Sequence, residues 1–212
     1  MFEFFLKGGP VMYPLLGCSI ISLTMIIERS MFWIIEKRRH SPDLVNEVME
    51  LCRTGDWEAI RVKVKGSRDY VIRVLVSGIL HRDFSLSKAM EVAATEEIKR
   101  MKRSLDIMDT MITVSPLLGI LGTVTGIIIS FDVLGHFGIE NPQSVTAGIA
   151  EALITTAAGL TIAIFTIFPY NYFNSKVEEA ATTLELYATS LEIIYEKLDI
   201  SKKNSRCSDE WA

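Results

Sequence analysis

The chain contains 212 residues, 49% of them hydrophobic, and its mean hydropathy of +0.29 is high for a soluble globular domain. A formal net charge of −4 gives no reason to expect nucleic acid as a partner. The apolar residues lie mainly in three stretches, roughly Val11–Ile35, Met111–Gly135 and Val145–Tyr170. Each is about as long as the ~20 residues that a helix needs to cross a bilayer, so we expect an all-α membrane protein with three transmembrane helices.

Residues 1–36 are predicted to form an N-terminal segment on the outer, periplasmic side followed by the first transmembrane helix. Lys7 alone precedes the apolar run, and bulky residues stand at Met25–Ile27, where a signal peptide would end in small ones. We therefore interpret this segment as an uncleaved membrane helix.

Residues 37–110 are predicted to form a cytoplasmic helical domain. Of the 22 Lys and Arg residues, 15 lie between Lys37 and Arg103, whereas the predicted loop at residues 136–145 contains none. The positive-inside rule then places the charged block in the cytoplasm and the loop outside. The N-terminus is accordingly outside and the C-terminus inside.

The first cytoplasmic helix has clear start and stop signals. Ser41 is a candidate N-cap, Pro42 occupies the first helical position, and the Thr54–Asp56 stretch is typical of a turn. These signals predict a helix from Pro42 to about Thr54.

The second transmembrane helix, residues 111–135, is predicted to continue an upstream cytoplasmic helix. The sequence contains no glycine or proline from Ser87 to Ser115. A continuous helix from Ser87 to about Leu134 would be ~72 Å long, and Pro116 would kink it near the inner leaflet.

The third transmembrane helix, residues 146–170, is likewise predicted to continue into a cytoplasmic C-terminal helix, residues 171–200. Two of the three membrane helices are therefore expected to be very long. The C-terminal helix has a short heptad seam, suited to packing on a neighbouring long helix, made of Val177, Leu184, Leu191 and Leu198. Residues 201–212 are predicted to be a disordered tail.

Small and polar residues share one face of each of the last two spans. At 100° per residue, the second-span face comprises Gly119, Gly122, Thr123 and Gly126. The third-span face comprises Gly148, Glu151, Ala152, Thr155, Thr156 and Gly159. Small residues let membrane helices approach closely, so we expect the two faces to pack on each other or around a shared component.

Depth separates the polar residues into two layers. Thr123 and Thr156 both lie ~15 Å below the outer surface, near the bilayer middle, and Glu151 lies ~7–8 Å below it. One interpretation is a plain packing face whose hydroxyls bond back to their own helix. A carboxylate inside a span costs roughly 2.5–3.5 kcal/mol on insertion scales, and this cost falls near the interface, so Glu151 is either functional or tolerated.

The motifs "SPLLGILGTVTGIIISF" and "GIAEALITTAAGLTIAIFTIFPYNYF" resemble the core signature of the ExbB/TolQ/MotA proton-channel family. The resemblance is strongest to its biopolymer-transport members, ExbB and TolQ. It covers the three spans and the general layout and is weak through residues 40–100. The segment "IFPYNYF" departs from the family pattern, with Phe165 and Thr166 where Ile and Pro are common.

The resemblance implies a ring of five subunits whose second and third spans line a central pore. The pore would hold single-span helices of an ExbD- or TolR-like partner, whose aspartate takes protons from outside and releases them inside. It also implies a TonB- or TolA-like energy transducer. By residue, Thr123 and Thr156 match the family's pore-lining threonines and Glu151 matches its third-span glutamate; Thr155 is an additional hydroxyl on the same path.

The function predicted is therefore an inner-membrane proton-channel stator subunit, ExbB-like, that powers TonB-dependent biopolymer transport across the outer membrane. The alternatives are a TolQ-like subunit of the Tol-Pal envelope system and a non-conducting membrane scaffold that oligomerises through its small faces. Flagellar MotA fits less well because this chain has room for three spans. The sequence suggests no enzyme, cofactor or metal site, since the three histidines are isolated, expected surface residues and the three cysteines form no CxxC.

Overall fold

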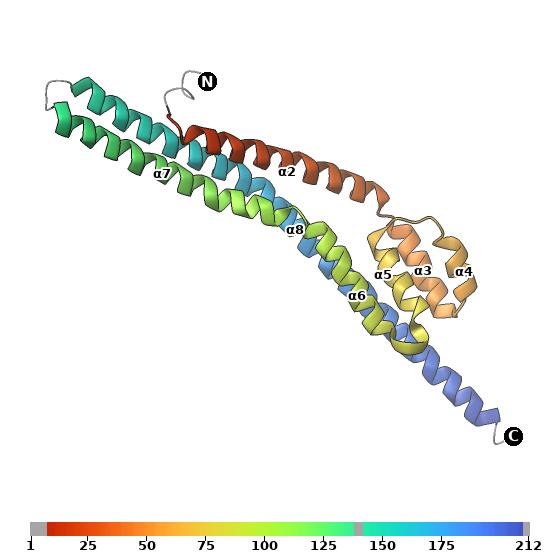
Figure 1. Ribbon diagram of the computed structural model, residues 1–212. Helices are drawn as coiled ribbons and strands as arrows, with labels where there is room; N and C mark the ends of the chain where they lie inside the picture. Colours follow the sequence, from red (N-terminus) through yellow and green to blue (C-terminus); the bar gives the residue numbers. More distant parts are fainter. Residues whose placement is uncertain (1–7, 138–141, 210–212) are drawn as a thin grey trace. The chain divides into compact units, whose positions relative to one another are not determined.

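The computed structural model describes the backbone of residues 8–137 and 142–209, and the side chains of these residues except Asp83 and residues 136–145 and 201–209. Every regular element in the described residues is an α-helix (Figure 1). The predicted all-α fold is therefore confirmed. Of the predicted loop at residues 136–145, only residues 138–141 lie outside the described backbone; residues 136–137 and 142–145 are helical, so the helices on both sides extend further than predicted.

Three of the helices are long and apolar enough to cross a membrane: α2 (Met12–Arg39), α7 (Leu105–Phe137) and α8 (Pro142–Asp209). The described helical stretches that contain a sufficiently apolar segment are Met12–Arg39, Leu105–Gly135 and Thr146–Ile200. Pro116 and Pro169 both lie inside helices that are assigned as continuous. The three predicted spans are thus present, and the third continues beyond membrane length as expected.

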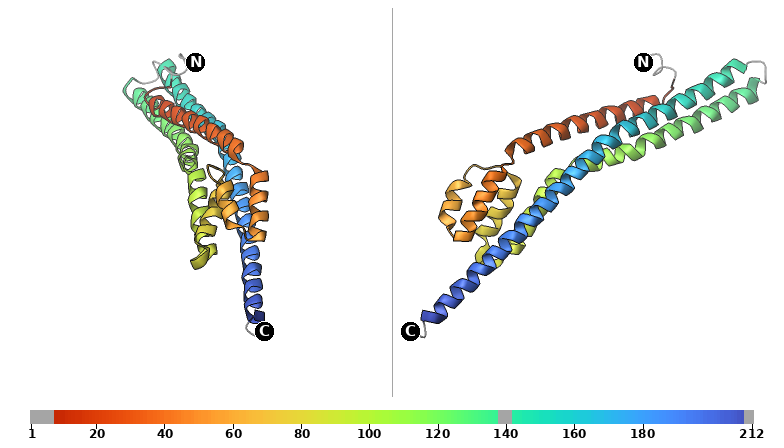
Figure 2. Two further views of the ribbon diagram at one scale, coloured as in Figure 1. Left: turned by 90° about the vertical axis from the view of Figure 1, so that its right-hand side faces the viewer. Right: turned by 180° about the vertical axis from the view of Figure 1, so that it is seen from behind.

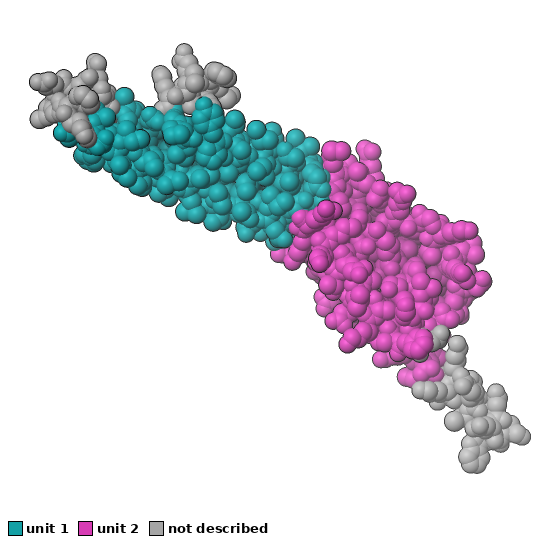
Figure 3. All heavy atoms as spheres, in the orientation of Figure 1, with its two compact units in different colours: residues 1–30, 104–174 teal, residues 31–103, 175–212 magenta. Residues whose placement is uncertain are grey.

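The chain divides into two compact units (Figure 3). Unit 1 comprises residues 1–30 and 104–174, and unit 2 comprises residues 31–103 and 175–212. Unit 1 contains α2 up to residue 30, all of α7 and the first half of α8. Unit 2 contains the charged segments that the sequence placed in the cytoplasm.

Unit 2 contains four further helices: α3 (Pro42–Thr54), α4 (Trp57–Lys63), α5 (Tyr70–Leu80) and α6 (Arg82–Lys102). The predicted bounds of the first are confirmed: Ser41 is its N-cap, and Gly55 ends it in the left-handed conformation with φ 74°. The core of this unit is aliphatic and fully buried, formed by side chains such as Val45, Val48, Val71, Leu75 and Met90.

The heptad seam of α8 lies within unit 2, where α6 and α8 run side by side (Figure 2). Val177, Leu184 and Leu191 are each at most 2% exposed, as expected for a packing seam. The C-terminal helix therefore packs along the helix that precedes the second span.

Two elements differ from the sequence prediction. The helix expected from Ser87 to Leu134 is divided into α6 and α7 at a turn formed by Arg103 and Ser104. This turn coincides with the boundary between the two units. Helix α8 also continues to Asp209, beyond the predicted end at residue 200, because no glycine or proline interrupts it there.

His40 was expected at the surface and is partly exposed, with 28% of its side chain accessible. Its Nδ1 lies 2.9 Å from Oδ2 of Asp69, which is fully buried and caps α5 by accepting from the backbone N–H of Val71. His40 also stacks on Tyr70, whose pKa is raised to about 12 by burial and by the Asp69 carboxylate. His81 is exposed, and the side chain of His136 lies outside the described part.

Candidate functional site

Small residues bring α7 and α8 into backbone contact inside unit 1. A Cβ added to Gly119 would lie 3.0 Å from the carbonyl oxygen of Thr155 and 3.0 Å from Cα of Thr156. One added to Gly126 would lie 2.8 Å from Cβ of Ala152. Larger side chains would therefore separate the helices, and in the structure the two small faces pack on each other.

The remaining predicted packing residues belong to the same contact. A Cβ on Gly122 would overlap the Thr155 side chain, and one on Gly148 would overlap the Ser130 hydroxyl. A Cβ on Gly159 would overlap the carbonyl oxygen of Ser115. The packed seam between α7 and α8 therefore depends on glycine over residues 115–130 of α7 and residues 148–159 of α8.

Thr123 and Thr156 meet across this contact. Thr156 Oγ1 donates to the carbonyl oxygen of Gly119 at 2.8 Å and lies 3.4 Å from Oγ1 of Thr123. Thr123 Oγ1 donates to the carbonyl of Ile120 at 2.7 Å. Both side chains are half-buried. The structure therefore brings the two hydroxyls, 33 residues apart in sequence, into one layer.

Thr155 occupies a different environment from its neighbour Thr156. It is 1% exposed, and its hydroxyl donates to the carbonyl of Ala152 at 2.7 Å. The carbonyl oxygen of Gly119 lies 3.4 Å from the same hydroxyl. This geometry makes Thr155 part of the packed seam between α7 and α8.

Glu151 lies beside the turn that precedes α2, a neighbour that sequence reasoning did not identify. A Cβ on Gly9 would overlap its Oε1 atom, so the carboxylate approaches the Gly9 backbone closely. Gly9 has φ 63°, which favours glycine at this position. Glu151 is half-buried there. The glycine pair Gly8-Gly9 was the available sequence signal, because glycine permits such an approach.

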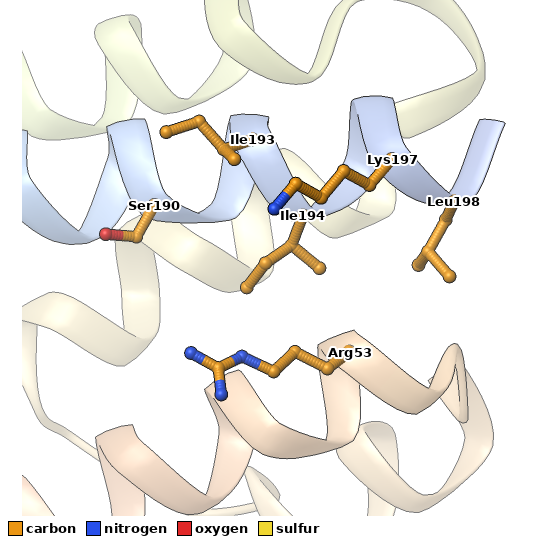
Figure 4. A pocket seen from close by; sticks show the side chains of 6 residues that line it. All are labelled: Arg53, Ser190, Ile193, Ile194, Lys197 and Leu198. Carbon is orange, nitrogen blue, oxygen red and sulfur yellow. The ribbon is translucent and has the colours of Figure 1, made fainter. Parts of the chain in front are cut away.

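A groove in unit 2 differs in chemistry from the contact between α7 and α8. A groove of about 430 Å³ separates Arg53 on α3 from Ile194, Lys197 and Leu198 on α8 (Figure 4). The described residues that line it are two cations, three aliphatic side chains and the Ser190 hydroxyl. None of these described side chains exchanges protons near neutral pH. Among the described residues, no cluster of His, Cys, Asp or Glu could hold a metal ion.

Residues 68–186 match the MotA/TolQ/ExbB proton channel family. The chain is 36% identical over 200 residues to the biopolymer transport protein ExbB-like 3 of Synechocystis sp., covering 91% of this chain and 93% of that protein. It is 30% identical over 190 residues to an ExbB homologue of Methanothermobacter thermautotrophicus, covering 87% and 66%. It is also 30% identical over 190 residues to the Tol-Pal system protein TolQ of Pseudomonas aeruginosa, covering 79% and 78%.

Proposed function

We propose that this chain, which belongs to the MotA/TolQ/ExbB proton channel family, is the stator subunit of a proton-driven membrane complex. In this proposal it is an ExbB-like protein that, with an ExbD-like partner, converts the proton motive force into mechanical work for TonB-dependent transport. Copies of the chain assemble into a ring, a pentamer by family resemblance, around the single-span helices of that partner.

The observation that carries this proposal is the hydroxyl layer formed by Thr123 and Thr156. A hydroxyl has one proton to donate and two lone pairs that accept. Thr156 uses its proton on Gly119, and Thr123 uses its proton on Ile120. Both oxygens keep acceptor capacity, so the layer suits a donor, such as water or a protonated carboxyl group.

A partner aspartate inside the ring supplies such a donor when it carries a proton. Burial in hydrocarbon disfavours the charged carboxylate, and two acceptor hydroxyls favour the protonated form further. The threonines themselves keep their protons and act through hydrogen bonds. Glu151, nearer the outer surface and close to Gly9, tunes the field at the outer mouth, and Thr155 supports the layer through the packed seam.

The proposed location is the bacterial inner membrane, with the N-terminus periplasmic and the C-terminus cytoplasmic. The support is the distribution of Lys and Arg, which concentrate between the first two spans. This orientation puts Glu151 on the side from which protons enter.

A TolQ-like role in the envelope is the second candidate, because the chain also aligns with TolQ over 79% of its length. A gentle pull-down of the tagged chain from its own membranes, followed by native mass spectrometry, separates the two. An ExbD-like protein with a TonB-like transducer supports the import role, and a TolR-like protein with a TolA-like transducer supports the envelope role. A homo-oligomer that never carries a single-span partner, across several detergents, supports a scaffold instead.

The hydroxyl layer is tested by Thr123→Ala and Thr156→Ala in the native host, scored by energy-dependent uptake or envelope integrity. We expect each to lower activity at least tenfold at normal protein level, and Thr156→Ser to retain most of it. Thr161→Ala is the matched control, since this exposed hydroxyl on the same helix bonds only to the carbonyl of Ala157 among the described residues. Normal activity in both layer variants would refute the proposed role.

A further inference from the structure

The inner end of α2 carries a buried carboxylate that the hydroxyl layer does not explain. Glu36 is 2% exposed and lies in unit 2, although α2 begins as the first membrane span. An isolated buried carboxylate costs several kcal/mol unless it is paired. Its partners come from two other helices of the unit.

Four side chains form a charge-balanced quartet, consisting of Glu36, Arg73, Glu97 and Arg100. Arg100 Nη2 donates to Glu36 Oε1 at 3.1 Å, and Arg100 Nε donates to Glu97 Oε2 at 2.9 Å. Arg73 Nη2 donates to Glu97 Oε2 at 2.7 Å and lies 3.9 Å from Glu36 Oε1. The quartet therefore joins α2, α5 and α6 through one connected set of hydrogen bonds.

Arg100 is the centre of this arrangement. Its planar guanidinium bridges two carboxylates from different helices, which a lysine ammonium cannot reproduce with the same geometry. The same guanidinium lies 5.3 Å from the centroid of the Phe32 ring, one turn before Glu36 on α2. Phe32 and Glu36 of α2 therefore both contact the same side chain of α6, that of Arg100.

Stability is a weak explanation for such a cluster. Replacing a buried ion pair by apolar side chains of similar size is often neutral or stabilising, because desolvation offsets the attraction between the charges. Fixing the relative position of elements is a better-attested use of buried polar networks. Here the fixed elements are the end of the first span and the helix that leads into α7, since Arg100 lies five residues before Leu105.

We propose that Glu36 is a positioning residue that couples the first span to α5 and α6 when the pore-lining helix α7 moves. This inference rests on the proposed stator function. In this proposal, movement of α7 is passed along the chain to Arg100 on α6. From Arg100 it reaches α2 through Glu36, and it reaches α5 through Glu97 and Arg73. Without the quartet, the cytoplasmic helices would no longer follow the membrane helices.

The test is the double substitution Glu36→Met with Arg100→Met, which leaves the Arg73–Glu97 pair charge-balanced. We expect it to insert, assemble and capture its partner as wild type does, and to lose at least fivefold in energy-dependent activity. The matched control is Glu50→Met with Arg53→Met, an exposed pair on α3 of the same unit, which should keep wild-type activity. Full activity in the Glu36–Arg100 variant would overturn the proposal.

Hydrogen exchange provides a readout that a purely structural role would not change. In wild-type proteoliposomes, imposing a proton gradient should alter amide exchange in Met31–Arg39 and in α5 together. In the Glu36–Arg100 variant the response of α5 should disappear, and its persistence would count against the coupling.

Arg100→Lys is the second variant, for the case that the double variant folds poorly. It retains the positive charge but loses the planar guanidinium that bonds to two carboxylates at once. It should reach normal protein level with reduced activity, and full activity would overturn the proposal. Thr156→Ala is measured in parallel, to distinguish failure of the coupling through Glu36 from failure of the stator function. An inactive Thr156→Ala beside a fully active Glu36–Arg100 variant removes this proposal alone, whereas normal activity in Thr123→Ala and Thr156→Ala removes the stator function.

Discussion

The contact between α7 and α8 predicts a strong effect from adding one methyl group at Gly126. The new Cβ would lie 2.8 Å from Cβ of Ala152, about 0.6 Å inside the 3.4 Å at which ordinary contacts begin. Neither atom can rotate away, because each Cβ is fixed by its backbone, so the helices must move apart. Overpacking of this kind costs about 1–3 kcal/mol. A loss of about 2 kcal/mol corresponds to a melting temperature lower by about 4–8 °C for a chain of this size.

The assay is thermal unfolding of the purified complex in detergent, followed by size-exclusion chromatography. Gly17→Ala is the matched control, because it adds the same methyl group to a membrane helix where the described residues leave at least 4 Å of free space. We expect Gly17→Ala to be neutral.

A compensating substitution tests the cause of the effect. Ala152→Gly removes the nearest atom that Gly126→Ala would overlap, so the double variant should recover part of the lost stability, while the carbonyl oxygen of Gly148 at 3.2 Å and Cα of Ala152 at 3.3 Å remain close. The double variant should then be at least about 1 kcal/mol more stable than the sum of the two single effects implies. A Gly126→Ala protein as stable as Gly17→Ala, or a double variant that shows no recovery, would refute the close packing of α7 on α8.

Two further predictions concern unit 2. Asp69→Ala should destabilise it by about 3 kcal/mol in thermal unfolding, because the fully buried carboxylate accepts from two backbone amides and faces the ring of His40; Asp56→Ala, which removes an exposed N-cap, should cost only about 1 kcal/mol. Burial raises the pKa of the Cys52 thiol to about 11, so alkylation mapped by mass spectrometry at pH 8 should be about a hundredfold slower than for a free cysteine. Because this pKa is raised in the folded state, the associated stability is present below about pH 9 and is lost as the pH rises towards 11.

Periodic and local signals were sufficient to predict the three spans and the first cytoplasmic helix, but not the short α4 or the break between α6 and α7. The three apolar stretches gave α2, α7 and α8, since length and hydropathy alone decide whether a helix can span a bilayer. The helix from Pro42 to Thr54 followed from a proline at its start and Gly55 at its end. The face shared by Gly119 and Gly126 followed from helix geometry, because both glycines lie on one side of a 3.6-residue repeat.

Contacts between distant segments could not be predicted in the same way. The approach of Glu151 to Gly9 joins residues 142 positions apart, and no periodicity connects them. Helix geometry placed Thr155 and Thr156 on one face, but a difference of 100° directs Thr155 into the seam and leaves Thr156 half-buried beside Thr123. The quartet around Glu36 was also invisible, since its members look like ordinary surface charges until three helices bring them together.

The packing of the small faces also bears on the scaffold hypothesis. That hypothesis requires the glycine faces of the second and third spans to join different copies of the chain. In the structure Gly119, Gly126 and Gly159 are already covered by the partner helix of the same chain, at distances that leave no space for another backbone. The exposed faces of these two spans are instead bulky, with Leu121, Ile128, Leu153 and Phe165 on them. The small residues instead hold the hydroxyls of Thr123 and Thr156 3.4 Å apart, an arrangement that the proposed proton path uses and that the scaffold hypothesis does not require.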